Sequence, residues 1–324
     1  MKFPRRHFLR LAAGAAALPV TVRIASAQAY PSRPVRLIVG FAAGGTPDIL
    51  ARLIGQWLSE RLGQQFVIEN RTGAGGNIAI ETVANAPADG YTLLLVPTAA
   101  AINATLYDKL NYNFIRDISP VAGIIRSPQI MLVNSSVPAR SVPEFIAYAK
   151  ANPGRLSMAS AGTGSGPHLI GELFKMMAGI DMVHVPYRGA SPAFADLIGG
   201  RVHVLFTNTP ANEHIQAGRL RALAVTGATR WEALPDVPSV GEFLPGYEAS
   251  AWFGIGAPKS TPGEIVGTLN ETINAGLSDP KVTARLAELG GTVLTGSPAD
   301  LGKLIADETE KWRKVVKFAG IKPE

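Results

Sequence analysis

Cysteine is absent from the 324 residues of the sequence. Its absence excludes disulfide frameworks, thiol catalysis, cysteine-held zinc or iron–sulfur sites, and lipid attachment through cysteine. Aromatic residues make up only 7% of the chain and charged residues 17%, and no basic cluster with interleaved aromatic residues occurs. A nucleic-acid-binding surface needs such a basic stripe, so we expect no nucleic acid as a partner.

The first 28 residues lack Asp and Glu, contain five basic residues and include a mostly apolar run over Leu11–Val22. Ala25-Ser26-Ala27 or Ala27-Gln28-Ala29 supplies a small-residue cleavage site, so the sequence predicts a cleaved export signal over residues 1–29. Arg5-Arg6 resembles a twin-arginine signal, and a twelve-residue run is too short to span a membrane, which needs about 20 residues. Without these five, 26 basic residues face 25 acidic residues, so the exported protein is nearly neutral.

Hydrophobic residues make up 47% of the chain, which is enough for a substantial core. Short apolar runs alternate with longer segments of helical period, such as Asp48–Leu62, and this order predicts an α/β fold with mostly parallel sheets flanked by helices. The predicted strands are Val35–Val39, Phe66–Glu69, Tyr91–Val96, Val121–Ile125, Ile130–Val133, Leu156–Ser160, Met182–Val185, Val202–Phe206, Leu220–Thr226 and Trp252–Ala257.

No flexible linker rich in Gly, Ser or Pro divides the chain, although its length exceeds the usual size of one core. If two domains exist, the chain should cross between them in structured segments. The best crossing points are the strand-like runs Ile125–Val133 and Ala249–Ala257. The last helices, up to Pro298–Ala319, would then return to the first domain.

The first predicted strand leads through a glycine-rich turn, Gly40–Asp48, into a helix. We expect Thr46 as the N-cap and Pro47 as the first helical residue. Such a turn directs backbone N–H groups and the positive helix end toward one point, which suits a carboxylate. A tight turn without a ligand is the alternative reading. The candidate ligand contacts here are Phe41, Ala43, Gly44, Gly45 and Asp48.

A second glycine-rich turn, Ala161–Leu169, follows the strand Leu156–Ser160 and opens another helix. It lacks the third glycine of a dinucleotide fingerprint and the flanking glycines of a nucleophile elbow. The candidate contacts are Gly162, Thr163, Gly164, Ser165 and His168. Ser165 and His168 also leave open an exported serine hydrolase or esterase, although their spacing does not suit a catalytic triad. His168 has a second reading, in which it caps a neighbouring loop.

Two further histidines, His184 and His203, lie inside predicted strands without the spacing of metal ligands, so no metal or cofactor is expected. Several runs together resemble the Bug-type (TctC-like) periplasmic solute-binding proteins of tripartite tricarboxylate transporters across nearly all of the chain after the signal. The runs are Val35–Arg52, Asn70–Ile78, Asp89–Leu94, Gly162–Leu169, Val185–Gly189, Ala217–Thr226, Pro235–Ser239 and Trp252–Gly254.

This resemblance implies a two-lobed, type II flytrap without catalytic residues, here with lobe 1 over 30–127 plus 253–324 and lobe 2 over 128–252. It implies a periplasmic receptor, which we expect to be a monomer. Hinge closure would capture a small organic carboxylate, mono-, di- or tricarboxylic and including aromatic acids, for a membrane permease. The further candidate contacts are Thr98, Asn103, Tyr187, Thr207 and Asn208, with Phe41 and Tyr187 as apolar walls.

One departure from the family pattern bears on the ligand. Members of the family often carry Asp after the strand that corresponds to Val202–Phe206, where this chain has Thr207 and Asn208. An aspartate there could pair with the ammonium group of an amino-acid ligand. The resemblance therefore implies that this receptor prefers a carboxylate without an α-amino group.

Overall fold

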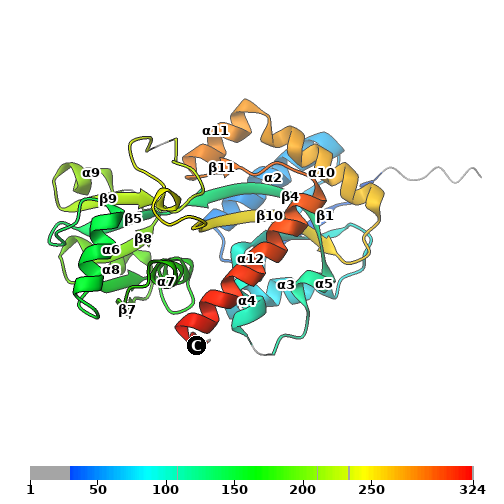
Figure 1. Cartoon of the computed structure of the whole chain (residues 1–324). Helices are drawn as coiled ribbons and strands as arrows, with labels where there is room; N and C mark the ends of the chain where they lie inside the picture. Colours follow the sequence, from blue (N-terminus) through cyan, green and yellow to red (C-terminus); the bar gives the residue numbers. More distant parts are fainter. Residues whose placement is uncertain (1–29, 108, 210, 233, 323–324) are drawn as a thin grey trace, which may run out of the picture.

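The computed structural model describes residues 30–322 except residues 108, 210 and 233. The predicted export signal over residues 1–29 lies outside the described residues. Within them, strands and helices alternate along the chain and gather around two separate sheets, one of six strands and one of five. Figure 1 shows the two sheets on opposite sides of the molecule, joined by strands that run between them.

The larger sheet has the order β11-β4-β10-β3-β1-β2. Its strands are β1 (Val35–Val39), β2 (Phe66–Asn70), β3 (Thr92–Pro97), β4 (Ile118–Pro128), β10 (Ser250–Pro258) and β11 (Thr292–Val293). The smaller sheet has the order β7-β6-β8-β5-β9. Its strands are β5 (Ile130–Asn134), β6 (Ser157–Ser160), β7 (Val183–Pro186), β8 (Val204–Thr207) and β9 (Leu220–Val225).

The ten predicted strands are all present, with ends that shift by at most three residues, whereas the two-residue β11 was not predicted. The expectation of mostly parallel sheets is wrong. Parallel pairing joins β1 to β2 and β3, and β6 to β7 and β8, but every pair made by β4, β5 and β10 is antiparallel. The reason is the path of the chain. β4 runs out of the larger sheet toward the smaller sheet, whereas β10 runs from the smaller sheet back into the larger one, so the two strands point in opposite directions.

The helices cover the sheets on both faces. They are α2 (Thr46–Leu62), α3 (Asn77–Ala84), α4 (Thr98–Leu106), α5 (Phe114–Asp117), α6 (Val142–Ala151), α7 (Gly166–Ala178), α8 (Ala190–Ile198), α9 (Asn212–Gln216), α10 (Gly263–Leu277), α11 (Pro280–Glu288) and α12 (Pro298–Ala319), with short 3-10 turns at η1 (Ala74–Gly76) and η2 (Val240–Glu242). In the part of the chain that the structure describes, none of them combines the length and apolar character that a membrane crossing requires.

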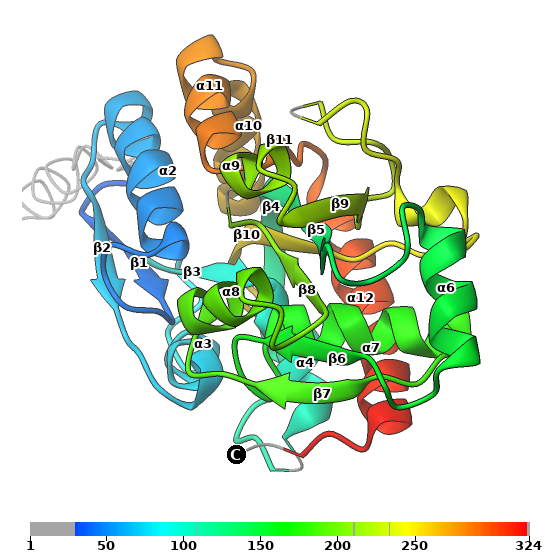
Figure 2. The same ribbon diagram turned by 90° about the vertical axis from the view of Figure 1, so that its left-hand side faces the viewer.

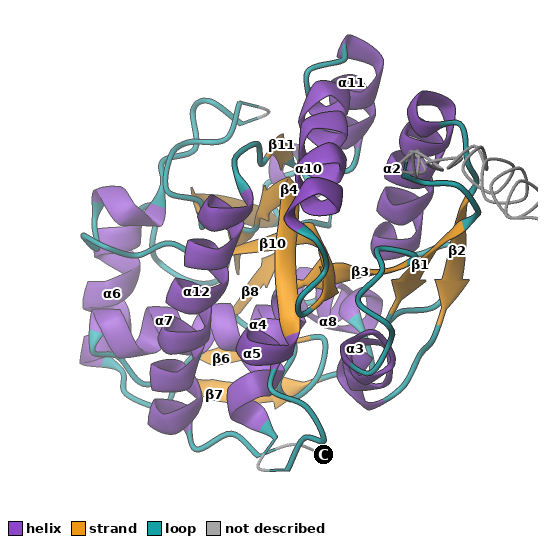
Figure 3. Cartoon of the chain, turned by 90° about the vertical axis from the view of Figure 1, so that its right-hand side faces the viewer, coloured by secondary structure: helices purple, strands orange, loops and turns teal. Residues whose placement is uncertain are grey.

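Burial on both faces explains why the strands show no clean alternation of apolar and polar residues. Figure 3 shows helices packed around the strands of the larger sheet. In β1, Val35, Leu37 and Val39 pack on the side of α2 and α10, whereas Ile38 faces the cluster that includes α12. The smaller sheet divides in the same way, since Met131 of β5 points toward α7 and the neighbouring Leu132 toward α8.

The two halves of the molecule are joined at a narrow crossing. β4 ends at Pro128 and β5 begins at Ile130, so the chain passes from one sheet to the other within two residues. The C-terminal helix α12 spans the junction, because it packs on α4 and β4 of the larger sheet and on α7 of the smaller one (Figures 1 and 2). This arrangement brings the starts of α4 and α7 to opposite walls of the same space.

Candidate functional site

A cavity of about 670 Å³ lies between the two halves. Both glycine-rich turns, α4, the crossing strands and α12 contribute to its wall. The lining residues are Phe41, Pro47, Gly75, Pro97, Thr98, Ala99, Ile102, Asn103, Leu106, Tyr107, Gln129, Ala161, Gly162, Thr163, Gly164, Ser165, Gly166, Ile170, Tyr187, Arg188, Gly189, Ser250, Ala251, Phe253 and Trp312. Eight of the fifteen predicted site residues are among them, from both halves of the chain.

On the side of the larger sheet, the wall is built from α4. The buried strand β3 ends at Pro97 and the helix begins at once, without a side-chain cap on its first N–H groups. Thr98 does not offer a free hydroxyl, because its Oγ1 accepts from the backbone N of Trp252 at 2.6 Å and donates to the Trp252 carbonyl at 3.0 Å. Asn103 is held by donating to Asn77 Oδ1 at 2.8 Å and to the Gly75 carbonyl at 3.0 Å. This wall is therefore rigid.

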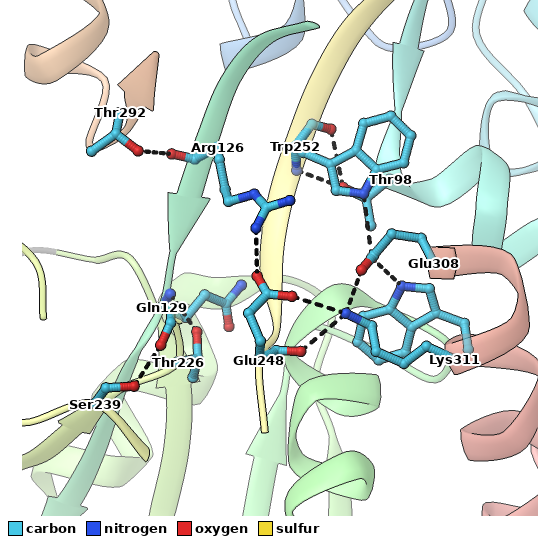
Figure 4. A network of polar contacts seen from close by, with 12 residues as sticks. Thr98, Arg126, Gln129, Thr226, Ser239, Glu248, Trp252, Thr292, Glu308 and Lys311 are labelled. Carbon is cyan, nitrogen blue, oxygen red and sulfur yellow. Dashed lines mark hydrogen bonds and ion pairs between the residues drawn. The ribbon is translucent and has the colours of Figure 1, made fainter. Parts of the chain in front are cut away.

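A polar network ties α12 to the crossing strand β10 next to the cavity (Figure 4). The buried carboxylate of Glu308 accepts from the indole N–H of Trp312 at 2.8 Å and from that of Trp252 at 3.3 Å. Lys311 pairs with Glu308 and with Glu248, at 3.2 Å from the latter. Paired in this way, the buried charge fixes α12 against the junction.

The first glycine-rich turn is closed by Asp48, whose side chain is buried. Its carboxylate forms a bidentate pair with Arg52 at 2.9 and 3.0 Å and also accepts from Gly44 N at 2.9 Å and from Asn70 Nδ2 at 3.0 Å. The Arg52 guanidinium, reinforced by these N–H donors, lowers the pKa of Asp48 to about 2. The negative charge therefore stays on the turn, and the turn is held against its own helix.

The second glycine-rich turn faces the cavity directly, through every residue from Ala161 to Gly166. Gly162 has φ +134° and Gly164 φ +75°, conformations that glycine adopts without strain. Ser165 occupies the N-cap of α7, but its side chain makes no capping hydrogen bond. The first N–H groups of a helix have no partner inside the helix. The start of α7 therefore presents its positive end at the cavity wall.

His168 holds the second turn from the side away from the cavity. Its Nδ1 accepts from Gly164 N at 3.0 Å, and its ring stacks on His184 with centroids 3.6 Å apart and planes 5° from parallel. His184 Nε2 lies 2.7 Å from Ser160 Oγ. Burial, together with the nearby positive charge of Lys175, lowers the pKa of His168 to about 3 and that of His184 to about 4. Both rings are therefore neutral at ordinary pH, and the Nδ1 lone pair remains available to Gly164.

The serine hydrolase reading does not fit this geometry. Ser165 Oγ has no hydrogen-bond partner among the described residues, and the Nδ1 of His168 is already engaged with Gly164. The other ring nitrogen, Nε2, is directed toward Glu172 at 3.7 Å, on the far side of the turn from the cavity. A general base must reach the hydroxyl that it activates, so Ser165 and His168 do not form a nucleophile and base pair.

Seven predicted site residues do not line the cavity: Ala43, Gly44, Gly45, Asp48, His168, Thr207 and Asn208. The first four belong to the first glycine-rich turn, whose backbone is held by hydrogen bonds to the Asp48 carboxylate. From this turn, Phe41 and Pro47 reach the cavity.

Thr46 is not the N-cap of α2, because Gly45 occupies that position. Thr207 is buried and donates its hydroxyl to Thr209 Oγ1 at 2.8 Å. Tyr187 does line the cavity, but its hydroxyl donates to Asp196 at 2.7 Å.

Sequence reasoning did not identify two polar residues of the cavity, Gln129 and Ser250, as site residues. Gln129 and Ser250 lie where β4 meets β5 and where β10 begins, so the predicted crossing points were the available signal for both. Of the described lining residues, Arg188 is the one charged side chain, and none is Asp or Glu. Nowhere in the described ranges do three or more His, Asp or Glu side chains gather as metal ligands. The cavity therefore has a local preference for anions.

Comparison with known proteins places the chain in a family. The profile described as the tripartite tricarboxylate transporter family receptor (TctC) matches residues 50–321. Protein BugT of Bordetella pertussis is 38% identical over 301 residues, which cover 92% of each chain.

Two similar structures were solved with a ligand. An R. palustris protein solved with adipate is 43% identical, with a TM-score of 0.74 and coverage of 91% of this chain and 100% of that one. MatC from Rhodopseudomonas palustris with bound malate is 33% identical, with a TM-score of 0.70 and coverage of 89% and 100%. By its profile, its relatives and its fold, the chain belongs to the Bug-type receptors of the tripartite tricarboxylate transporter (TctC) family.

Proposed function

We propose that this protein is an extracytoplasmic receptor that captures a small organic carboxylate in the cavity between its two halves. One observation carries the proposal: two helix starts, those of α4 and α7, and Arg188 meet at a cavity whose described lining contains no acidic side chain. A carboxylate there gains backbone N–H donors and helix dipoles without a repelling charge. The adipate and malate bound to similar proteins support the same ligand class.

The lobes and contacts that we propose follow from the cavity. Lobe 1 comprises residues 30–127 plus 253–324 and lobe 2 residues 128–252, with the ligand between them. The direct contacts are Gly162–Ser165 of the second turn, with Asn103 on the opposite wall and Phe41 as an apolar wall. We propose a supporting role for Thr98, Asp48 and His168, because their polar atoms are engaged in holding the walls.

The ligand that we propose has no α-amino group. An ammonium group buried in the closed receptor would need a carboxylate partner, since an unpaired buried charge is costly. The described lining supplies none. Thr207, which replaces the frequent aspartate of the family, is itself engaged with Thr209.

The proposal also includes the export route of the receptor and its membrane partner. The export signal over residues 1–29 would deliver the receptor to the periplasm, where the closed, liganded form would meet the permease of a tripartite tricarboxylate transporter. We propose that the receptor works as a monomer and catalyses no reaction. The separation of Ser165 from the ring nitrogens of His168 supports the absence of hydrolysis.

A thermal-shift screen of organic acids tests the proposal. A ligand at 100 times its dissociation constant adds about 2.7 kcal/mol to the free energy of unfolding. We expect such stabilisation with one or more amino-free mono-, di- or tricarboxylates, and none with matched amines or neutral amides. A screen in which no carboxylate raises Tm would overturn the proposed function. Stabilisation by aspartate or glutamate alone would overturn the exclusion of an α-amino group.

A further inference from the structure

Three buried polar atoms around the cavity have no hydrogen-bond partner among the described residues. They are Gln129 Oε1, Ser165 Oγ and Ser250 Oγ, and they come from three separate segments of the chain. The Gln129 residue is 9% exposed and Ser250 is 3% exposed. Nearly all buried polar groups in native proteins are paired, because an unpaired one loses its hydrogen bonds to water without replacement. A ligand that pairs these atoms would replace those hydrogen bonds.

The backbone of Gln129 is fixed at the crossing between the two sheets. Its N–H donates to Thr226 Oγ1 at 2.8 Å, and its carbonyl accepts from Thr226 N at 2.8 Å (Figure 4). The side-chain amide reaches the start of α7, because Gln129 Nε2 lies 3.9 Å from the position that a Cβ on Gly166 would occupy. The Gln129 amide therefore lies close to Gly166, at the helix start where we place the ligand carboxylate.

Ser250 lies at the same crossing. It is the first residue of β10, and its partner in the β4 ladder is Pro128, the residue before Gln129. The Gln129 and Ser250 residues both line the cavity. We call these two residues together the polar floor.

We propose that the polar floor binds a hydroxyl group on the carbon next to the ligand carboxylate, so that the receptor selects 2-hydroxycarboxylates over the corresponding deoxy acids. This inference rests on the proposed function. A hydroxyl group both donates and accepts, so it can donate to Gln129 Oε1 while it accepts from Ser250 Oγ. A second carboxylate only accepts, which leaves Gln129 Oε1 without a donor. The α-carboxylate itself would accept from Ser165 Oγ and the start of α7.

Calorimetry with matched acid pairs tests the inference on the protein without its signal. The pairs are lactate with propionate, malate with succinate, and 2-hydroxyglutarate with glutarate. For the pair that fits the cavity, we expect the hydroxy acid to bind about 3- to 10-fold more tightly, as one to two neutral hydrogen bonds predict. Ser250→Ala and Gln129→Met should each reduce this ratio toward one, chiefly by weakening the hydroxy acid.

Ser127→Ala is the matched control, because Ser127 lies in β4 two residues before Gln129 but donates to the Gly290 carbonyl at 2.8 Å and does not line the cavity. It should leave the ratio unchanged. Equal or tighter binding of the deoxy acids to the unmodified protein overturns the polar-floor inference and leaves the proposed function standing. A preference that survives both floor variants also overturns it. If no acid of any pair, and no other carboxylate, binds, the proposed function fails and the inference fails with it.

Discussion

The two glycine-rich turns have similar sequences but different positions relative to the cavity. Each follows a buried strand and opens a helix with Pro in its first turn. The second turn faces the cavity through all residues from Ala161 to Gly166, whereas Gly40–Asp48 contributes only Phe41 and Pro47. Two turns of similar sequence therefore have different roles. The second turn forms part of the cavity wall, whereas most of the first turn lies outside it.

The difference lies in the side chain that holds each turn. Asp48 is charged and accepts hydrogen bonds from Arg52, Gly44 and Asn70, so the turn closes on its own carboxylate. His168 is neutral and takes a single N–H, that of Gly164, from the side away from the cavity. An anionic support would also repel a carboxylate ligand at short range, whereas a neutral ring does not. We infer that the residue that holds each turn decides whether the turn can bind an anion.

The largest expected effect comes from placing the same substitution in both turns. Gly162→Ala puts a side chain at φ +134°, outside the regions open to L-residues, so the second turn must shift. Gly44→Ala puts one at φ +83°, which is also strained for an L-residue, but Gly44 does not line the cavity. We expect at least about tenfold weaker carboxylate binding for Gly162→Ala and a change within about twofold for Gly44→Ala, by calorimetry. Equal losses would show that both turns bind.

We expect a smaller effect from replacing His168, the residue that holds the second turn. His168→Leu removes the acceptor of the Gly164 N–H, which should weaken ligand binding about fivefold, in line with one hydrogen bond. His168→Asn retains a side-chain oxygen near the position of Nδ1 and should bind within about twofold of the unmodified protein. Circular dichroism at 25 °C verifies that both variants are folded. Matching affinities for Leu and Asn would mean that His168 only fills space.

A third effect, on stability and not on ligand binding, is a dependence on pH that separates the two supports. Unfolding returns the histidine pKa values from about 3 and about 4 to the ordinary 6.5, so the unfolded chain binds protons first as the pH falls below 6.5. The free energy of unfolding should therefore decrease between pH 6.5 and 4. Asp48, with a pKa of about 2, stays charged throughout this window.

Urea unfolding at pH steps between 7 and 4 measures this decrease. A variant with both His168→Asn and His184→Gln should lose less stability on acidification than the unmodified protein, since it lacks the two titrating rings. An identical pH slope in both proteins would contradict the assignment of the neutral histidine pair.

Local patterns predicted the elements well. The apolar run over Val35–Val39 became β1 without a change of bounds, and the predicted helix Pro298–Ala319 is α12. The two-residue β11 was missed because Thr292–Val293 is too short to show a periodic pattern of apolar residues. It is recognised as a strand only by its pairing with β4. Strand direction was also beyond local patterns, since an apolar run looks the same whichever way its neighbour runs.

About half of the candidate site could be predicted from the sequence. Glycine conformations and helix starts are local, so Gly162, Thr163, Gly164 and Ser165 could be named in advance. Gln129 and Ser250 could not, because their importance depends on two segments, 121 positions apart in the sequence, that meet only in the folded chain. The hydroxyl of Thr207 differs, because it turns to Thr209 only two residues further on, a local contact that the apolar pattern of the strand did not show.

The helices, the strands and two anion-suited turns could be predicted from near neighbours along the chain, and the nearly neutral charge after removal of the predicted signal from composition alone. Which turn forms the cavity wall, how Asp48 and His168 each hold their turn, and how α12 spans the junction became apparent only in the folded chain. Hydrogen bonds and packing between distant segments depend on distances in space, and those exist only after both sheets have formed and the chain has crossed between them.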